Sequence, residues 1–378
     1  MTKVLSVITD LNIGGAGVVL LNFMKKTDRA RFDHTVAVPE GSELAPRLRG
    51  LGIKVVEMPG IGERSLRLRT ILAFRAVLAD LRPDIVHTHA SLSARIAATL
   101  RGGCAVIHTR HCAYPQGKVK TSFPVKQMLG FLNNRLSDAI IAISPAAAEN
   151  LVSTGTDPKI ITTMFNGTDP ARLLGDEERS AVRASLGIDR DDFVCAIIAR
   201  LVPEKGHDCV LDAAAMLSSL PIRFIIAGAG PLDAELRATA ARRGLGNCVF
   251  TGFVEDVARI ENITDLQLNA SYGTETSSLS VLEGMSLGVP AVVSDFGGNP
   301  HIVTDGFDGL VFPRRDPSAL ASAIQRLYDE RDTLSRMGAN AKTTYGERFT
   351  AEEMAAGIER VYGKFASALC GAQVVRSQ

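Results

Sequence analysis

The chain has 378 residues, of which 46% are hydrophobic and 22% are charged, and its formal net charge is +1. This length allows two or three domains, this composition excludes a disordered chain, and no apolar run reaches the roughly 20 residues of a membrane-spanning helix. Residues 1–166 carry 21 Lys and Arg against 12 Asp and Glu, whereas the remainder carries 21 against 29, which indicates two modules with different partners.

Short β-branched runs alternate with helical patterns along the whole chain. The predicted strands are seven in the first half, VLSVIT, HTVAVP, KVVEM, DIVHTH, AVIHTR, AIIAIS and IITTMF, and six in the second, FVCAIIA, RFIIAGAG, CVFTGF, LQLNAS, AVVSD and GLVF. Near-continuous apolar strands separated by helices predict an α/β fold with two doubly wound, Rossmann-like parallel-sheet domains. Ligands bind beyond the carboxyl ends of such strands, so we expect the site in a cleft between two facing sheets.

The loop DLNIGGAGVVLL follows the first strand and opens the first helix. Gly14 and Gly15 allow close backbone approach, and the helix N-terminus favours an anion. The G-G-A-G spacing departs from the dinucleotide fingerprint, so a Rossmann cofactor with Glu40 on its ribose remains an alternative, as does an ordinary tight turn. The first residues, MTKVLSVITDLN, favour a first strand over a signal peptide.

Four of the seven histidines end strands in the first half: His87 and His89 in VHTHAS, and His108 and His111 in IHTRHCAY. A histidine at a strand's carboxyl end is a candidate ligand contact or proton donor. The alternatives are hydrogen bonding at the strand ends and a metal site, for which no acidic or thiolate companion is evident. The six cysteines form no C-x-x-C pair, which is typical of the reduced thiols of cytosolic proteins.

Two segments of the basic half mix cations with apolar side chains. They are ERSLRLRTILAFR, with Arg64, Arg67, Arg69 and Arg75, and QGKVKTSFPVKQMLGF, with Lys118, Lys120 and Lys126 beside Phe123 and Phe131. Such segments suit an anionic membrane surface and a lipid-linked acceptor, although a solvated helix face is the alternative. Nucleic-acid binding is disfavoured, because the cations lack interleaved aromatics and the whole chain is near neutral.

The polar stretch NGTDPARLLGDEERS is the predicted hinge, and the second half follows it. Arg200 and Lys205 lie in the loop after a strand and just before a helix, next to Gly206. Two cations beside a helix N-terminus favour a diphosphate pocket over ordinary surface charges. Gly230, in AGAGP, belongs to another glycine-rich turn between a strand and a helix.

The stretch ETSSLSVLEGMSLGVPAV places Glu283 eight positions after Glu275. If the helix begins near Ser280, both glutamates face one bound molecule, and carboxylates accept hydrogen bonds from the hydroxyls of a polyol. The alternative is a capping box between Ser280 and Glu283, which leaves Glu275 unexplained. Further on, Asp316 is the expected N-cap of a helix, and a last helix is predicted from about Thr350.

In this order, the motifs resemble those of the retaining glycosyltransferases of family four, which have the GT-B fold. The resemblance covers nearly the whole chain and rests on GGAG, HTRH, NGTD, RLVPEKG, GAGP, ETSSLSVLE, GVPAVVSDFGG and DGLVFPRRDP. It implies an acceptor-side domain over residues 1–165 and a nucleotide-sugar donor domain over 166–348. It also implies a helix over 349–378 that crosses back to the first domain.

The same resemblance implies a role for each matching residue. Arg200 and Lys205 would hold the diphosphate, Glu283 would grip the ribose, and His111 would contact the donor sugar from the other domain. Glu275 would contact the sugar hydroxyls, with help from backbone N–H groups of residues 277–279. The implied catalytic residues are Arg200, Lys205, Glu275 and His111, and the implied donor-binding residues are Gly14, Gly15, Asn166, Gly167, Arg200, Lys205, Gly230, Glu275, Thr276, Ser277, Ser278, Leu279 and Glu283.

The implied reaction moves a sugar from a nucleotide-diphosphate sugar, such as a UDP-sugar, to a glycan or lipid-linked acceptor in cell-surface polysaccharide or glycolipid synthesis. The anomeric configuration would be retained without a covalent nucleophile, a cofactor or an obligatory metal. We expect a cytoplasmic protein with peripheral attachment at the inner face of the membrane. A GT-B sugar-nucleotide epimerase and a non-catalytic nucleotide-sugar-binding subunit are the alternatives. Departures from the family pattern at residues 276–278 and at His301 leave the donor sugar open.

Overall fold

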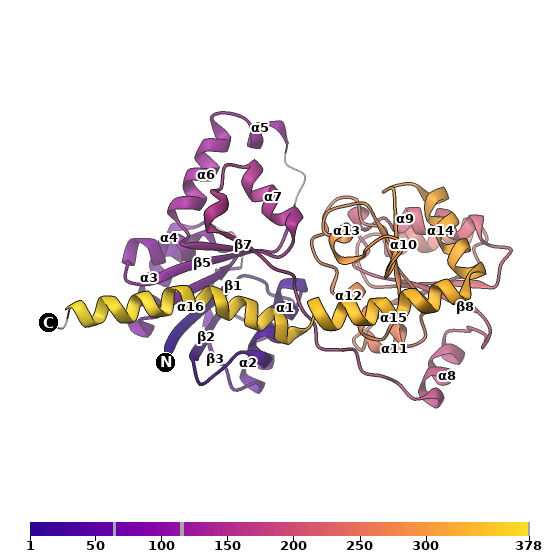
Figure 1. The fold of residues 1–378 in the computed structure, drawn as a ribbon, viewed down its shortest axis with the longest axis horizontal. Helices are drawn as coiled ribbons and strands as arrows, with labels where there is room; N and C mark the ends of the chain where they lie inside the picture. Colours follow the sequence, from indigo (N-terminus) through magenta and orange to yellow (C-terminus); the bar gives the residue numbers. More distant parts are fainter. Residues whose placement is uncertain (63–65, 114–116, 377–378) are drawn as a thin grey trace. The chain divides into compact units, whose positions relative to one another are not determined.

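The protein is described by a computed structural model that covers residues 1–62, 66–113 and 117–376, with side chains as far as residue 366 (Figure 1). The chain forms two compact units. The first unit is Met1–Gly167 together with Ala351–Gln378, and the second is Thr168–Thr350. These divisions lie two residues after the expected boundaries at 165 and 348, and they assign the last helix to the first unit.

The first unit is built on a parallel sheet with the strand order β3-β2-β1-β4-β5-β6-β7. The strands are β1 (Thr2–Ile8), β2 (Phe32–Pro39), β3 (Lys54–Met58), β4 (Ile85–His89), β5 (Ala105–Arg110), β6 (Ala139–Ala142) and β7 (Ile161–Thr163). The helices are α1 (Gly15–Lys26), α2 (Leu44–Gly50), α3 (Leu68–Leu81), α4 (Leu92–Arg101), α5 (Lys118–Thr121), α6 (Val125–Arg135), α7 (Pro145–Ser153) and α16 (Ala351–Arg376), with a 3₁₀ turn at Pro158–Ile160. All seven strands predicted in the first half are confirmed.

Helices cover both faces of this sheet (Figure 1). On one face, Leu5 and Val7 of β1 pack with Phe74 of α3 and Ala94 of α4. On the other face, the ring of Tyr362 from α16 contacts the sheet and α1. β4 lies between β1 and β5 and is buried along its whole length, although three of its five residues, His87, Thr88 and His89, are polar.

The second unit has a six-stranded parallel sheet in the order β10-β9-β8-β11-β12-β13. The strands are β8 (Phe193–Ile198), β9 (Ile222–Ala227), β10 (Cys248–Gly252), β11 (Leu266–Asn269), β12 (Ala291–Ser294) and β13 (Gly309–Phe312). The helices are α8 (Asp176–Ser185), α9 (His207–Met216), α10 (Asp233–Arg242), α11 (Ala258–Glu261), α12 (Leu279–Ser286), α13 (Asn299–Ile302), α14 (Pro317–Asp329) and α15 (Arg331–Arg348), and the 3₁₀ turn η2 spans Pro203–Lys205. These six strands are also those that the sequence predicts.

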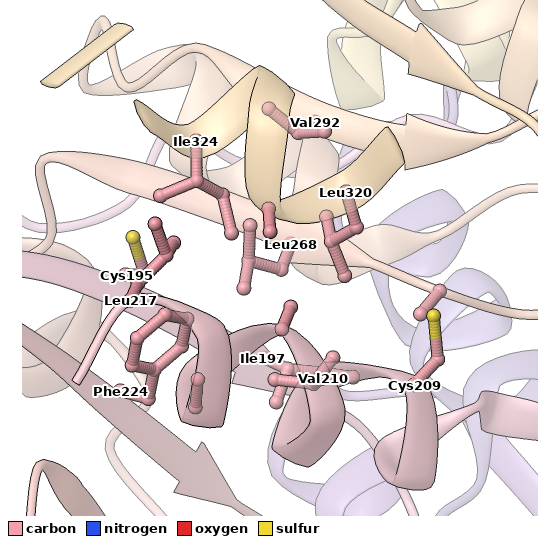
Figure 2. Close-up of a cluster of buried hydrophobic side chains, with 14 of the residues drawn as sticks. Cys195, Ile197, Cys209, Val210, Leu217, Phe224, Leu268, Val292, Leu320 and Ile324 are labelled. Atoms are coloured by element: carbon pink, nitrogen blue, oxygen red, sulfur yellow. The ribbon is translucent and has the colours of Figure 1, made fainter. Parts of the chain in front are cut away.

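The core of the second unit lies between the sheet, α9 and α14. Figure 2 shows Leu268 and Val292 of the sheet facing Val210 of α9, and Leu320 and Ile324 of α14. Asp316 caps α14 as predicted, because its carboxylate accepts a hydrogen bond from the Ala319 N–H at 2.9 Å. Among the residues that the model describes, no helix is both long and apolar enough to cross a membrane.

The strand order of the second sheet reverses beside β8, because β8 pairs with β9 on one side and with β11 on the other. The loops that leave the carboxyl ends of β8 and β11 therefore run to opposite faces of the sheet and open a crevice between them. Arg200 and Lys205 lie in the first of these loops and Glu275 in the second.

Candidate functional site

The loop after β8 packs directly on the loop after β11. Gly206 lies between η2 and α9 with a φ of 70°, and a Cβ atom there would stand 2.2 Å from the carbonyl oxygen of Ala270. The N–H of Tyr272 also donates to the carbonyl of Glu204 at 2.9 Å. Glycine is therefore required at position 206 for conformation and for space, and it brings Lys205 to Glu275.

Glu275 is the centre of a buried polar cluster. Its Oε2 atom accepts hydrogen bonds from Lys205 Nζ at 2.8 Å, from Asn269 Nδ2 at 3.0 Å and from Ser271 Oγ at 3.1 Å. The side chains of Glu275 and Lys205 are only 5% and 17% exposed. Within the described residues these bonds all reach Oε2, so Oε1 is left for a ligand.

The carboxyl of Glu275 is held in its charged form. Burial raises its pKa, but the ammonium of Lys205 and the hydrogen bonds from Lys205, Asn269 and Ser271 outweigh burial and lower the pKa below its usual range. A buried carboxylate with three donors on one oxygen is a rigid acceptor for hydroxyl groups.

Sequence reasoning identified Glu275 and Lys205 but missed the residues that hold them. Asn269 and Ser271 stand at the end of β11, and Asn299 of α13 donates to Asn269 Oδ1 at 3.3 Å. Gly297 and Gly298 lie against the backbone of the Glu275 loop, where Cβ atoms would stand 2.1 Å from the Glu275 carbonyl and 1.8 Å from that of Thr276. The motif GVPAVVSDFGG contained the two glycines, but only the fold shows what they contact.

The helix that follows this loop begins at Leu279 with Ser278 at the N-cap position, and no side chain caps it among the described residues. The capping box that the sequence offers as an alternative is wrong, because the Ser280 hydroxyl donates instead to the carbonyl of Ile198 at 3.1 Å. The hydroxyl of Ser277 is buried and has no partner within the described residues. The start of α12 thus presents backbone N–H groups that suit an anion or a polar ligand.

Glu283 does not take part in the Glu275 cluster. Its carboxyl interacts electrostatically with that of Glu261, the last residue of α11, which is 2% exposed. Burial, together with the charge of Glu283, raises the pKa of Glu261 to about 9, and burial raises the pKa of Glu283 to about 7. The two carboxyls therefore share a proton near neutral pH, which the spacing of Glu275 and Glu283 does not predict.

The two sequence-predicted cations differ in their surroundings. Lys205 is committed to Glu275, whereas the side chain of Arg200 is exposed and makes no hydrogen bond or ion pair within the described residues. The Arg200 carbonyl accepts a hydrogen bond from His207 Nε2 at 3.0 Å, which holds the loop while the guanidinium stays available. Arg200 is the more exposed cation of this pair and is more accessible to an anionic ligand than Lys205.

Gly230 has a packing role in the structure. A Cβ atom at this position would stand 2.3 Å from the carbonyl oxygen of Leu201, next to Arg200. The Leu201 N–H donates to the Ala229 carbonyl at 2.9 Å, and the Leu232 N–H donates to the Leu201 carbonyl at 3.1 Å. The glycine-rich turn after β9 therefore supports the loop that carries Arg200.

Gly14 and Gly15 differ from Gly230. Gly14 is the N-cap of α1 without a side-chain cap, and Cβ atoms at either glycine would meet nothing within 4 Å. Packing among the described residues does not require glycine here, and space beside a helix N-terminus is left for a ligand. Asn166 is buried, and the Gly167 carbonyl accepts a hydrogen bond from Asn22 of α1 at 3.3 Å.

The four strand-end histidines divide between the two faces of the first sheet. His89 Nδ1 and His111 Nε2 are 2.8 Å apart, and His87 lies on the same face as His89. His108 lies on the opposite face and contacts Thr88. Within the described residues, no group of three or more His, Cys, Asp or Glu side chains is arranged to hold a metal ion.

Two family models match the chain. The model described as Glycosyltransferase Family 4 matches residues 13–172, and the model described as Glycosyl transferases group 1 matches residues 178–344. Each match corresponds to most of one unit of the structure.

Two curated relatives are each 28% identical to the chain. One is the UDP-Gal:alpha-D-GlcNAc-diphosphoundecaprenol alpha-1,3-galactosyltransferase of Escherichia coli, which matches over 291 residues, 73% of this chain and 74% of that protein. Another is the D-inositol 3-phosphate glycosyltransferase of Streptomyces scabiei, which matches over 339 residues, 81% of this chain and 75% of that protein.

Solved structures share the fold. HepE of Anabaena, in complex with UDP and glucose, has a TM-score of 0.83 and 20% identity, and the match covers 96% of this chain and all of that one. A glycosyltransferase of Rickettsia africae has a TM-score of 0.84 and 17% identity, and the match covers 97% and 98% of the two chains. The predicted fold class is confirmed, and the chain belongs to the family-four glycosyltransferases, which have the GT-B fold.

Proposed function

We propose that this protein transfers a sugar from a nucleotide-diphosphate sugar, with UDP-sugars as the first candidates, and that the anomeric configuration is retained. The observation that carries the proposal is the buried carboxylate of Glu275, charged and held on one oxygen beside the uncapped start of α12. Its second oxygen is suited to a sugar hydroxyl. The name of the Escherichia coli relative, which specifies a UDP-galactose donor, supports a UDP-sugar.

In this proposal the leaving diphosphate is stabilised by Arg200, by Lys205 and by the N–H groups at the start of α12. Glu275 is committed to Lys205, so we assign it to sugar positioning and not to nucleophilic attack. The acceptor hydroxyl attacks from the side of the leaving group and passes its proton to the departing phosphate. Positive charge from these groups replaces that of a metal ion, so we propose that no divalent ion and no cofactor is needed.

Binding is the first test, and the structure favours Arg200→Gln over a Lys205 variant. Arg200 is exposed, so its loss leaves no buried charge behind, whereas loss of Lys205 leaves the Glu275 carboxylate uncompensated. We expect UDP to raise the melting temperature of the wild type without metal, and Arg200→Gln to weaken UDP binding about 10- to 100-fold, as for a charge-assisted contact to phosphate. Arg242→Gln, another exposed cation of the second unit, is the matched control. No shift with UDP or any other nucleoside diphosphate would sink the proposal.

Turnover separates the transferase from its alternatives. Slow hydrolysis of UDP-glucose, followed by proton NMR in the presence of EDTA, should release UDP and initially α-glucose, the anomer that retention gives. Initial release of β-glucose would contradict retention, and a requirement for added metal would contradict the metal-free mechanism. An epimerase would convert the donor sugar without an acceptor. A binding subunit would bind the nucleotide equally in the wild type and in Glu275→Gln and would turn over in neither.

We further propose a glycan or lipid-linked acceptor and attachment of the first unit to an anionic membrane surface. Val119 of α5, Phe123, and Met128 and Phe131 of α6 are 73%, 80%, 56% and 67% exposed. The same stretch of the sequence contains the exposed Lys118 and Lys120 and the half-buried Lys126. An exposed apolar surface with cations beside it suits anionic lipid headgroups and acyl chains, and the named acceptor of the Escherichia coli relative is a diphosphoundecaprenol.

Two further observations concern the basic segments of the first unit. Arg95 of α4 is buried and donates to the Asn133 side chain at 3.2 Å and to Ser137 Oγ at 2.9 Å, which fastens the end of α6 to the unit. On α3, Leu68 and Leu72 are 73% and 56% exposed. Arg64, which the sequence places in that basic segment, lies outside the described residues.

Cosedimentation with vesicles tests the attachment. We expect the protein to bind vesicles of phosphatidylglycerol and phosphatidylcholine more than vesicles of phosphatidylcholine alone, and 0.5 M salt to reduce the binding. Phe123→Ser with Phe131→Ser should lower it, whereas Phe253→Ser, at a 78% exposed residue of the second unit, should not. Equal binding by all variants would contradict this surface.

A further inference from the structure

A row of histidine rings crosses one face of the first sheet. The ring centroids of His87 and His89 are 4.5 Å apart, and those of His89 and His111 are 5.1 Å apart at an angle of 24°. Side chains alternate between faces along a strand, and His89 pairs with Thr109 across β4 and β5. His87, His89, Thr109 and His111 therefore share the face that α16 covers.

His87 is the rigid end of the row. Its Nδ1 is 2.6 Å from the hydroxyl of Tyr362 on α16, and its Nε2 is 2.6 Å from the hydroxyl of Thr109 on β5. His87 and Tyr362 are both fully buried. With both nitrogens engaged, the His87 ring cannot rotate without losing a buried hydrogen bond, and it forms a firm surface against which His89 stacks.

His89 joins this support to His111. Its Nδ1 is 2.8 Å from His111 Nε2, and its other nitrogen is buried without a partner within the described residues. Burial lowers the pKa of His89 and of His111, and each further cation in the row would lower them more. Both rings are therefore neutral, and each carries a single N–H.

Two neutral imidazoles that share one hydrogen bond have coupled tautomers. One nitrogen of the pair donates and the other accepts, so the protonation of His89 Nδ1 decides whether Nε2 of His111 carries hydrogen. The same choice determines whether Nδ1 of His111 is a donor or an acceptor. Stacking against His89 sets the plane of the His111 ring as well.

We propose that His89 is a positioning residue for His111, fixing the ring plane and the tautomer with which His111 meets the donor sugar. The inference rests on the proposed function and on the contact between His111 and the donor sugar that the family resemblance implies. The observation that carries it is the 2.8 Å contact between two buried or half-buried rings, one of them supported from behind by His87.

Two substitutions of His89 separate positioning from packing. In Asn, an amide oxygen or nitrogen is bonded to Cγ at the position that Nδ1 occupies in His. His89→Asn therefore keeps a hydrogen-bonding group beside His111. His89→Leu removes both nitrogens and keeps an apolar side chain of similar bulk, so His111 Nε2 loses this hydrogen-bond partner while the site stays filled. The protein has seven histidines, so His111→Gln, which lacks this ring, identifies the NMR signals of His111.

The first readout is the tautomer of His111 from imidazole ¹⁵N shifts, and the second is UDP-glucose hydrolysis. We expect one neutral tautomer in the wild type, a mixture in His89→Leu, and an intermediate distribution in His89→Asn, whose amide can donate or accept. We expect His89→Leu to lower kcat about 10- to 100-fold, the usual effect of a misplaced contact. The Kd for UDP should stay within about twofold, since the cations for the diphosphate lie in the second unit.

The outcomes distinguish this inference from the proposed function. An unchanged tautomer and unchanged kcat in His89→Leu would overturn the positioning role, as would a tautomer mixture in the wild type. Equal loss in His89→Asn and His89→Leu would overturn it too, because packing alone would then explain the effect. If the wild type hydrolyses no nucleotide sugar, the proposed function fails, and the ¹⁵N comparison still decides whether His89 sets the tautomer of His111.

Discussion

Buried polar side chains at the carboxyl ends of the two sheets differ in their charge state. In the second unit, Glu275 and Lys205 are both charged and lie 2.8 Å apart, with Asn269 and Ser271 supplying further hydrogen bonds. In the first unit, the buried histidines are neutral, and burial lowers the pKa of His87 to about 3. An ion pair in the second unit and neutral rings in the first unit both avoid an isolated buried charge. The first leaves a charged carboxylate for a ligand, and the second leaves a neutral imidazole.

The glycine turns differ in the same manner. At Gly230 of the second unit, the carbonyl of Leu201 occupies the space that a Cβ atom would need. At Gly15 of the first unit, a Cβ atom would meet nothing within 4 Å. One glycine builds the loop that carries a functional cation, and the other leaves room at a helix start. A glycine-rich motif alone therefore does not tell a structural turn from a ligand site.

The ion pair gives the largest expected effect on stability. Lys205→Met leaves a buried carboxylate without its cation, so we expect a loss of about 3–5 kcal/mol of unfolding free energy. The double variant Lys205→Met with Glu275→Gln should recover much of that loss, because no buried charge remains. Urea denaturation followed by circular dichroism measures both. A loss below about 1 kcal/mol in the single variant would show that this charge is solvated after all.

Gly230→Ala should lower the free energy of unfolding by about 1–3 kcal/mol. The added Cβ would stand 2.3 Å from the backbone oxygen of Leu201, which cannot move aside as a flexible side chain could. Gly15→Ala is the matched substitution in the first unit. It should be neutral or stabilising by up to about 1 kcal/mol, since alanine favours a helix and nothing lies in its way. Similar melting temperatures for the two variants would remove the distinction between closed and open glycine turns.

Tyr362→Phe tests the neutral network of the first unit. It leaves His87 Nδ1 buried without its partner, and we expect a loss of about 1–3 kcal/mol in urea denaturation. Tyr328→Phe in the second unit keeps the ring contact with Phe193 and is the control with little expected effect. If both variants behave alike, the hydroxyl of Tyr362 contributes nothing beyond its ring.

The smallest effect is expected for Glu261→Gln near pH 5, and this effect grows as the pH rises. Burial raises the folded-state pKa of Glu261 to about 9, so its stabilising contribution is fully present below pH 4.5 and is lost as the pH rises through 9. The neutral amide does not titrate. Melting temperatures should therefore be similar at pH 5, while the variant should be the more stable protein at pH 9. A parallel decline in both proteins would contradict a shared proton between Glu261 and Glu283.

The buried histidines determine the stability of the wild type and of Glu261→Gln at acid pH, where Glu261 has no effect. The pKa of His87 is lowered to about 3 by burial, so its contribution is present above pH 6.5 and is lost as the pH falls through 3. The wild type and Glu261→Gln should lose stability together on the acid side. The two units are thus expected to limit stability at opposite ends of the pH range.

Much of the fold follows from local patterns. Runs such as VLSVIT and FVCAIIA are apolar throughout because both faces of a parallel sheet are covered, and this composition identifies the strands. Once the strands are identified, residues such as Arg200 and His111 fall at the edge where ligands bind. The division of charge along the chain likewise corresponds to two units.

The sequence by itself thus determined the strands, their parallel arrangement and the side chains at their carboxyl ends, because these depend on neighbours along the chain. Only the tertiary structure decided which side chains meet. Lys205 and Glu275 are 70 positions apart, and His87 and Tyr362 are 275 apart, so no local pattern encodes their contact. The capping box at Ser280 was predicted wrongly for the same reason. The local pattern assigned the Ser280 hydroxyl to the helix start, whereas in the structure it donates to the carbonyl of Ile198, on a strand 82 positions away. Tertiary packing sets how deeply each side chain is buried and which hydrogen-bond partners it has. These two properties decide which of the identified groups are charged, neutral or free to bind.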